Sequence, residues 1–146
     1  MLVRFTPEQV TKFWYGIEAG IASALPPGIS NDPDKMNNLL ASILIGKTDC
    51  WISYERNEQG MAAVNGAVLT QIVADESGAR NLLLYAVYGV VTQVMSKWAE
   101  GYEVLRKWAA ANSCAHITAY TDRPEICELA KRYGGNAEWR YIILPV

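Results

Sequence analysis

The chain has 146 residues, of which 51% are hydrophobic and 19% are charged, and its formal net charge is -2. This length and composition are typical of one globular domain with an apolar core of ordinary size, and they exclude a disordered chain. Because Lys and Arg are scattered and form no basic face for a phosphate backbone, we expect no nucleic-acid partner.

Cysteine and histidine are scarce. The spacing of Cys50, Cys114 and Cys127 predicts no disulfide framework, and a single histidine argues against a zinc site, so we expect no metal. The longest apolar run, residues 82–91, is too short to cross a bilayer. The first residues carry no signal-peptide pattern, so we expect a cytoplasmic protein without a membrane partner.

The first part of the chain predicts one strand and two helices. Residues 2–5 are an apolar run that can begin a sheet, and Thr6, Pro7 and Gln9 form a capped helix start. Apolar residues then recur at helical spacing at Val10, Phe13, Trp14, Ile17, Ile21 and Leu25. A second helix is expected after Asp32, ending at Gly46.

From residue 50 the apolar pattern has a period of two and predicts three antiparallel strands joined by short turns. The expected strands cover residues 50–55, 64–73 and 82–88. We expect Gly66 to lie inside the second strand, where a bulge or a close backbone approach needs it. A tight turn at Asn65 and Gly66 is the alternative, and it leaves a very short segment.

The last part predicts a helix over residues 96–112, a strand over 116–121, a helix over 124–133 and a strand over 138–144. The first of these helices is a crossover between parallel strands. The predicted fold class is α/β (α+β), with one domain over residues 1–146. Its sheet is mixed and mostly antiparallel, with helices on both faces, in the order β-α-α-β-β-β-α-β-α-β.

This order resembles the GNAT superfamily of N-acetyltransferases along the whole chain. Residues 3–9, 64–68, 103–117 and 123–134 are each similar to a passage of that family, and the third of these carries Leu105, Trp108, Ala109, Cys114 and Ile117. More narrowly, residues 98–102 and 120–124 resemble divergent GNAT-like proteins encoded by tailed phages and prophages. That likeness implies a protein of the host cytoplasm or of the virion.

The resemblance also implies a binding site for acetyl-CoA or another acyl-CoA, with its pyrophosphate at the start of the third helix. The family signature there is Gln or Arg, two residues, Gly, one residue, and Gly or Ala. Gln93 fits it, whereas Ser96 and Trp98 replace the glycines, so a capped helix with a core tryptophan is the simpler interpretation. The implied cofactor-binding residues are Tyr88, Val90, Gln93, Ser96, Lys97 and Trp98.

The acid that protonates the departing thiolate in many family members is a tyrosine, and the matching position here is Ala130. The remaining catalytic candidates are Tyr88, Tyr120 and Glu55, the last as a base acting through water, with Tyr85 as a further substitute. Tyrosines on strands are more often packing residues.

Other reactive or aromatic residues have a plainer interpretation. We expect His116 to be a solvent-facing or hydrogen-bonded structural residue and Cys114 to be a buried thiol. Trp98 and Trp139 could form a patch for a partner chain, and a homodimer is compatible with the sequence.

Two hypotheses about function follow. The first is an acyl-CoA-dependent N-acyltransferase with a degenerate cofactor loop, acting on a small amine or a protein acceptor. The second is a catalytically inactive binding or assembly module of the same fold, of phage origin. Strands that part near Tyr88 and Ile117 would favour the enzyme, and Trp98 filling that opening would favour the module.

Overall fold

The computed structural model describes residues 1–89 and 95–146, and five of its strands form one sheet in the order β1-β2-β3-β4-β5. The first three pairings are antiparallel and the last is parallel. The strands are β1 (Leu2–Arg4), β2 (Asp49–Arg56), β3 (Ala62–Ala74), β4 (Arg80–Gly89) and β5 (His116–Ala119). The helices are α1 (Pro7–Ser23), α2 (Lys35–Leu44), α3 (Met95–Ala111) and α4 (Pro124–Arg132). The predicted fold class is confirmed.

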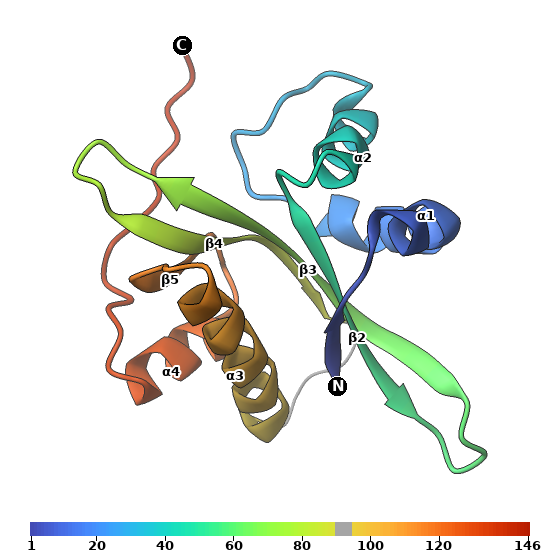
Figure 1. Cartoon of the computed structure of the whole chain (residues 1–146). Helices are drawn as coiled ribbons and strands as arrows, with labels where there is room; N and C mark the ends of the chain where they lie inside the picture. Colours follow the sequence, from blue (N-terminus) through green and yellow to red (C-terminus); the bar gives the residue numbers. More distant parts are fainter. Residues whose placement is uncertain (90–94) are drawn as a thin grey trace.

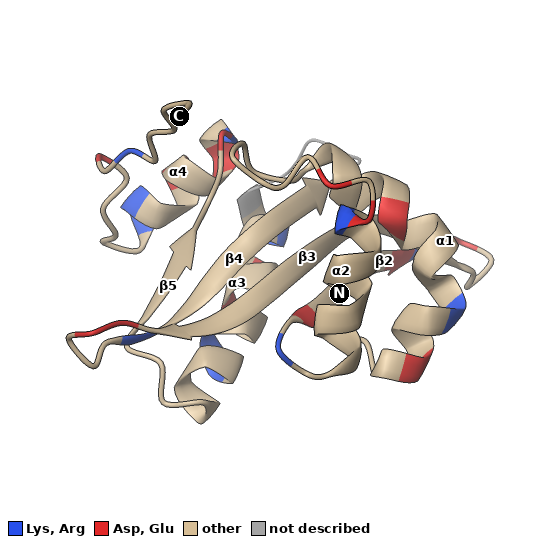
Figure 2. Ribbon diagram, turned by 90° about the horizontal axis from the view of Figure 1, so that it is seen from above, with Lys and Arg blue, Asp and Glu red and all other residues tan. Residues whose placement is uncertain are grey.

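Helices cover both faces of the sheet (Figure 1). On one face α1 and α2 pack against a cluster that includes Val10, Ile21 and Leu69, and on the other face α3 and α4 pack against a cluster that includes Leu82 and Leu105. Figure 2 shows the Lys and Arg residues dispersed among the helices and loops.

The start of α1 follows the sequence closely. The Gln9 N–H donates to Thr6 Oγ1 at 3.3 Å, and the Thr6 N–H donates to Gln9 Oε1 at 2.8 Å, so the predicted capping box is formed. The helix buries Val10, Trp14, Ile17 and Ile21. Each helical turn therefore contributes an apolar side chain to the core.

Gly66 lies inside β3, as the sequence predicts. The register between β2 and β3 shifts beside it, where Ser53 pairs with Gly66 but Tyr54 pairs with Val64. A Cβ on Gly66 would stand 2.8 Å from the Tyr88 carbonyl oxygen. Both the bulge and the close backbone approach are present, and the alternative of a tight turn is wrong.

The predicted strand over residues 138–144 does not form, so the order ends with β5 and α4. Within the described residues, no backbone hydrogen bond joins this segment to a strand. The Tyr141 ring instead stacks on Tyr120 with 4.8 Å between centroids, and Ile143 packs where a Cβ on Gly28 would stand, at 2.9 Å. The segment is therefore held by side-chain contacts and not by backbone hydrogen bonds to the sheet.

Two properties of the helices and polar side chains bear on function. Among residues 1–89 and 95–146, no helix is both long and apolar enough to span a membrane. Over the same residues, no group of three or more His, Cys, Asp and Glu side chains is placed to hold a metal ion.

Candidate functional site at the parting of β4 and β5

β4 and β5 are paired over only the first half of β4. The parallel register runs from Asn81 opposite His116 to Leu84 opposite Ala119, and the Tyr120 N–H donates to the Leu84 carbonyl at 3.1 Å. Residues 86–89 of β4 then continue alongside β3. The two strands therefore part just beyond Leu84, so Tyr88 lies in the half of β4 that β5 does not pair with, whereas Ile117 still pairs with Leu82.

A bulge in β4 marks the point of parting. Leu69 of β3 pairs with Ala86 while Thr70 pairs with Leu84, so Tyr85 has no partner in β3. Such a bulge bends its strand and re-aims a side chain, and bulges are frequent beside active sites. Here the bulge brings the side chain of Tyr85 to the opening.

Three tyrosines meet at the opening. Tyr85 and Tyr120 form an edge-to-face pair with 6.4 Å between centroids, and Tyr120 stacks on Tyr141. Burial, followed by the neighbouring Tyr120 and Tyr141 hydroxyls, raises the pKa of Tyr85, so its hydroxyl keeps its proton. The sequence does not mark Tyr141 as a site residue, because residues 138–144 have the pattern of a closing strand.

A pocket of about 190 Å³ adjoins Tyr85 on the side of α1 and α2. Its walls are mainly apolar, with Lys35, Ser30 and Asn38 as its polar side chains. The complete lining is Leu25, Ile29, Ser30, Lys35, Asn38, Leu39 and Tyr85. Among the described residues that line the pocket there is no Asp or Glu, and Lys35 is the one charged side chain.

Tyr88 is held away from the tyrosine cluster. Two ring carbons of Tyr88 lie 2.7 Å from where a Cβ on Gly20 would stand, so the ring packs closely against α1. Its backbone pairs with Ala67 of β3. The Tyr88 ring therefore packs on the α1 face, whereas the described aromatic partners of Tyr120 are Tyr85 and Tyr141.

The start of α3 carries three of the predicted cofactor residues. Ser96 is exposed, and Lys97 forms an ion pair with Glu55 of β2. The hydrogen bond from Lys97 is the largest cause that lowers the pKa of Glu55. Glu55 is thus the ion-pair partner of Lys97, on a strand that β3 and β4 separate from β5. Val90 and Gln93 lie outside the described residues.

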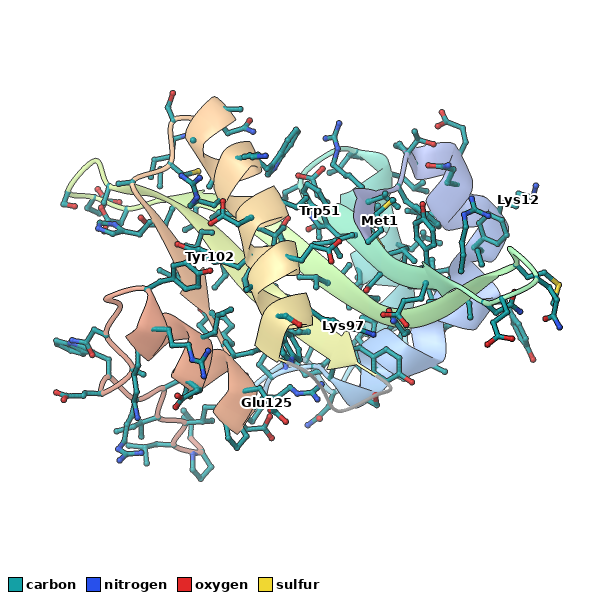
Figure 3. All side chains as sticks on the ribbon, turned by 90° about the horizontal axis from the view of Figure 1, so that it is seen from below. Met1, Lys12, Trp51, Lys97, Tyr102 and Glu125 are labelled. Atoms are coloured by element: carbon teal, nitrogen blue, oxygen red, sulfur yellow. The ribbon has the colours of Figure 1, made fainter. Side chains whose placement is uncertain are left out.

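Arg123, which precedes α4, reaches across the opening. Its guanidinium lies 5.4 Å from the Trp98 ring centroid, and its Nη1 lies 3.2 Å from where a Cβ on Gly89 would stand. Its Nε is 3.7 Å from Glu125 Oε2. Figure 3 labels Lys97 and Glu125, which come from the first turns of α3 and α4. The sequence does not mark Arg123 as a site residue, because no local pattern shows that its side chain packs beside Gly89.

Solved structures with the same architecture include N-acetyltransferases. A ribosomal-protein-alanine N-acetyltransferase from Brucella melitensis biovar Abortus 2308 is 16% identical, with a TM-score of 0.64 over 100% of this chain and 99% of that chain. An aminoglycoside acetyltransferase from an uncultured soil metagenomic sample is 14% identical, with a TM-score of 0.68 over 100% and 97%. The chain has the GNAT fold.

A third structure of the GNAT fold, an aminoglycoside N-acetyltransferase, AAC(6')-Iy, was solved in complex with CoA. It is 15% identical, with a TM-score of 0.65 over 100% of this chain and 93% of that chain. No family model matches the sequence, and no curated protein matches it. The likeness is therefore one of fold, and function has to be argued from the site.

The parting of β4 and β5 beside Arg123 fits an acyl-CoA more clearly than the start of α3 does. The parted strands and the half-buried guanidinium of Arg123 suit an extended ligand with phosphate groups. Lys97 is paired with Glu55, as Arg123 is with Glu125, and Trp98 lies under Arg123. Trp98 also packs against the core cluster of that face, as the simpler sequence interpretation expected.

The remaining predicted residues have structural positions. His116 is exposed, with its Nδ1 3.1 Å from Oδ1 of Asn81, and Cys114 is half-buried against the α3 face. Trp139 is 89% exposed, whereas Trp98 is half-buried and packs against the cluster under α3 and α4.

Proposed function

We propose that the chain is an acyl-CoA-dependent N-acyltransferase, with acetyl-CoA or another acyl-CoA as donor and an amine as acceptor. The observation that carries the proposal is the parting of β4 and β5 at Tyr85 and Tyr120, directly beside the pocket under α1 and α2. The opening and the pocket together can hold two ligands on either side of one tyrosine pair.

The reaction needs a group that returns a proton to sulfur. In acyl transfer to an amine, a C–N bond forms, the C–S bond breaks, the nitrogen loses a proton and the thiolate gains one. Tyr85, Tyr120 and Tyr141 carry the hydroxyls at the opening, and the raised pKa of Tyr85 keeps it a proton donor at neutral pH. We assign Tyr120 as the acid, and Tyr85 as the neighbour that packs edge-to-face against its ring.

The pocket also bears on the acceptor. Two of the similar structures are aminoglycoside acetyltransferases by their names, and aminoglycosides are polycations. In the part of the chain that the structure describes, the pocket has Lys35 and no carboxylate, and most of its lining is apolar. Such a site favours a small amine or a peptide amine that also carries an apolar or anionic group, and it disfavours a polycation.

Binding and turnover of the donor test the proposal. We expect acetyl-CoA to give a measurable heat of binding to the wild-type chain, and Arg123→Ala to weaken that binding by removing a cation from the opening. Tyr120→Phe should leave binding intact and lower kcat by about 10²-fold or more. Tyr15→Phe is the matched control, because Tyr15 is 95% exposed on α1 and should leave both quantities unchanged.

The pair formed by Arg123 and Trp98 favours a second candidate function. If these side chains close the opening permanently, the chain is a binding or assembly module of the GNAT fold, as the likeness of residues 98–102 and 120–124 to phage proteins also implies. In that case the wild-type chain gives no heat with acetyl-CoA, whereas Trp98→Gly, which restores a glycine of the family signature, binds it.

A further inference from the structure

Lys35 lines the pocket beside Tyr85 without an anionic partner in the described part of the chain. It lies in the first turn of α2 and is half-buried. Within residues 1–89 and 95–146 its ammonium forms no ion pair, whereas Lys97 is paired with Glu55. A half-buried cation that lines a pocket and has no such partner favours an anion brought by a ligand.

The acidic residues nearest to Lys35 in the sequence make other contacts. Asp32 Oδ1 accepts the Asp34 N–H at 2.8 Å, and Asp34 Oδ1 lies 3.5 Å from Asn37 Nδ2. Both aspartates are exposed, and neither lines the pocket. An anion that entered the pocket would therefore approach Lys35 without displacing a carboxylate of the described lining.

Two neutral polar side chains, Ser30 and Asn38, accompany Lys35 in the lining. Ser30 Oγ accepts the Asp32 N–H at 3.0 Å, which leaves the hydroxyl proton for another acceptor, and the Asn38 amide carries two N–H donors. One cation with neutral donors matches a group with a single negative charge, such as a carboxylate. A phosphate group carries about 1.5 to 2 negative charges at neutral pH and is matched less well by one lysine.

The size and the walls of the pocket limit the rest of the ligand. Its volume of about 190 Å³ is below the roughly 300 Å³ at which pockets for drug-sized ligands begin. Leu25, Ile29 and Leu39 give it apolar walls, and Tyr85 belongs both to this lining and to the tyrosine cluster at the opening. These limits favour a compact ligand with an aliphatic body, in which the amine and the carboxylate are close together.

We propose that the acceptor is a free α-amino acid with an aliphatic side chain, and that Lys35 selects it by pairing with its carboxylate. The inference rests on the proposed function and narrows it, because the same carboxyl group is a neutral amide in a peptide N-terminus. Acyl transfer forms a bond between the acyl carbon and the amino nitrogen and breaks the C–S bond. The ammonium of the amino acid loses two protons, of which the thiolate takes one and solvent the other.

Binding of L-leucine without any acyl-CoA tests the carboxylate site by itself. We expect L-leucine to shift the amide NMR signals of residues 25–39 in the wild-type chain. L-Leucinamide has the same amine and side chain but no negative charge, and it should bind about tenfold more weakly or less. Lys35→Met should bind both compounds equally, and Lys35→Arg should keep the preference for L-leucine. Lys47→Met is the matched control, because Lys47 is exposed beyond the opposite end of α2.

Acetyl transfer from acetyl-CoA measures the same preference during turnover. The kcat/KM for L-leucine should exceed that for L-leucinamide by about tenfold or more in the wild-type chain, and Lys35→Met should lose this difference. Binding of L-leucine that depends on Lys35 but leads to no turnover would support the carboxylate site and contradict the proposed function. Turnover of both compounds at equal kcat/KM would support the proposed function and overturn the inference.

Three further results would overturn the inference. The first is equal binding of L-leucine and L-leucinamide by the wild-type chain, a comparison that needs no variant. The second is a preference for L-leucine that survives in Lys35→Met, once circular dichroism shows that the variant is folded. The third is tighter binding of the phosphonate analogue of leucine than of leucine itself, which would assign the pocket to a phosphate-like dianion.

Discussion

At the scale of single residues, Gly66 is required by the close approach of β3 and β4. An added Cβ would stand 2.8 Å from the backbone oxygen of Tyr88, which cannot move without disturbing the sheet. We expect Gly66→Ala to lower the free energy of unfolding by about 1 to 3 kcal/mol. Urea denaturation measures the change. Gly16→Ala is the control, since nothing lies within 4 Å of its added Cβ and α1 should gain about 0.5 to 1 kcal/mol. Equal effects at both glycines would contradict this account.

Cys50 gives a pH dependence with a defined sign. Burial, followed by the charge of Asp49, raises the pKa of the Cys50 thiol from 9.0 to about 12. The folded chain keeps the thiol protonated where the unfolded chain has lost the proton. Its contribution to stability is therefore complete below pH 9 and declines above it, by up to about 1.4 kcal/mol per pH unit.

The measurement is urea unfolding at a series of pH values on both sides of the ordinary pKa of cysteine. We expect the alkaline slope of the free energy of unfolding to be smaller in Cys50→Ala than in the wild-type chain. Cys127→Ala should keep the wild-type slope, because Cys127 is only half-buried in α4. An unchanged slope in Cys50→Ala would assign the pH dependence to other groups.

At the scale of elements, the first turn of α1 depends on its cap. Thr6 and Gln9 satisfy each other's backbone N–H groups. Removing the hydroxyl in Thr6→Ala should cost about 1 kcal/mol of stability, measured by thermal or urea unfolding. Thr11→Ala is the control: its hydroxyl donates to the Pro7 carbonyl within the helix, and its loss should be nearly neutral. A neutral Thr6→Ala would mean that water replaces the cap without loss.

Local patterns predicted α1 and the bulge at Gly66 because their causes are local: a cap, a helical period and a glycine inside a strand. The segment 138–144 shows where that reasoning fails. Its side chains have the composition of a strand, but a strand also needs a partner edge, and the sequence does not say where the chain will lie after Gly135. The residues of the site divide in the same way. Tyr120 was a catalytic candidate from the sequence, whereas Arg123 and Tyr141 are recognised only by contacts between residues distant in the sequence.

At the scale of the whole molecule, β3 and β4 link two separate cores. Leu69 is completely buried in the cluster under α1 and α2, and Leu82 is completely buried in the cluster under α3 and α4. Each cluster is built on side chains of the same central strands, which alternate between the two faces. Neither helical layer can bury its apolar face without that shared sheet, so the two faces should fold as one cooperative unit.

Leu82→Ala tests this cooperativity. Deleting a fully buried leucine side chain should lower the free energy of unfolding by about 2 to 5 kcal/mol. Because the sheet is shared, hydrogen exchange should accelerate in α1 on the opposite face as much as in α4, where the cavity forms. Leu69→Ala should produce the same pattern from the other side. If hydrogen exchange in Leu82→Ala became faster only in α3 and α4, the two faces of the sheet would open separately. The gap between β4 and β5 could then widen while the core under α1 stayed folded.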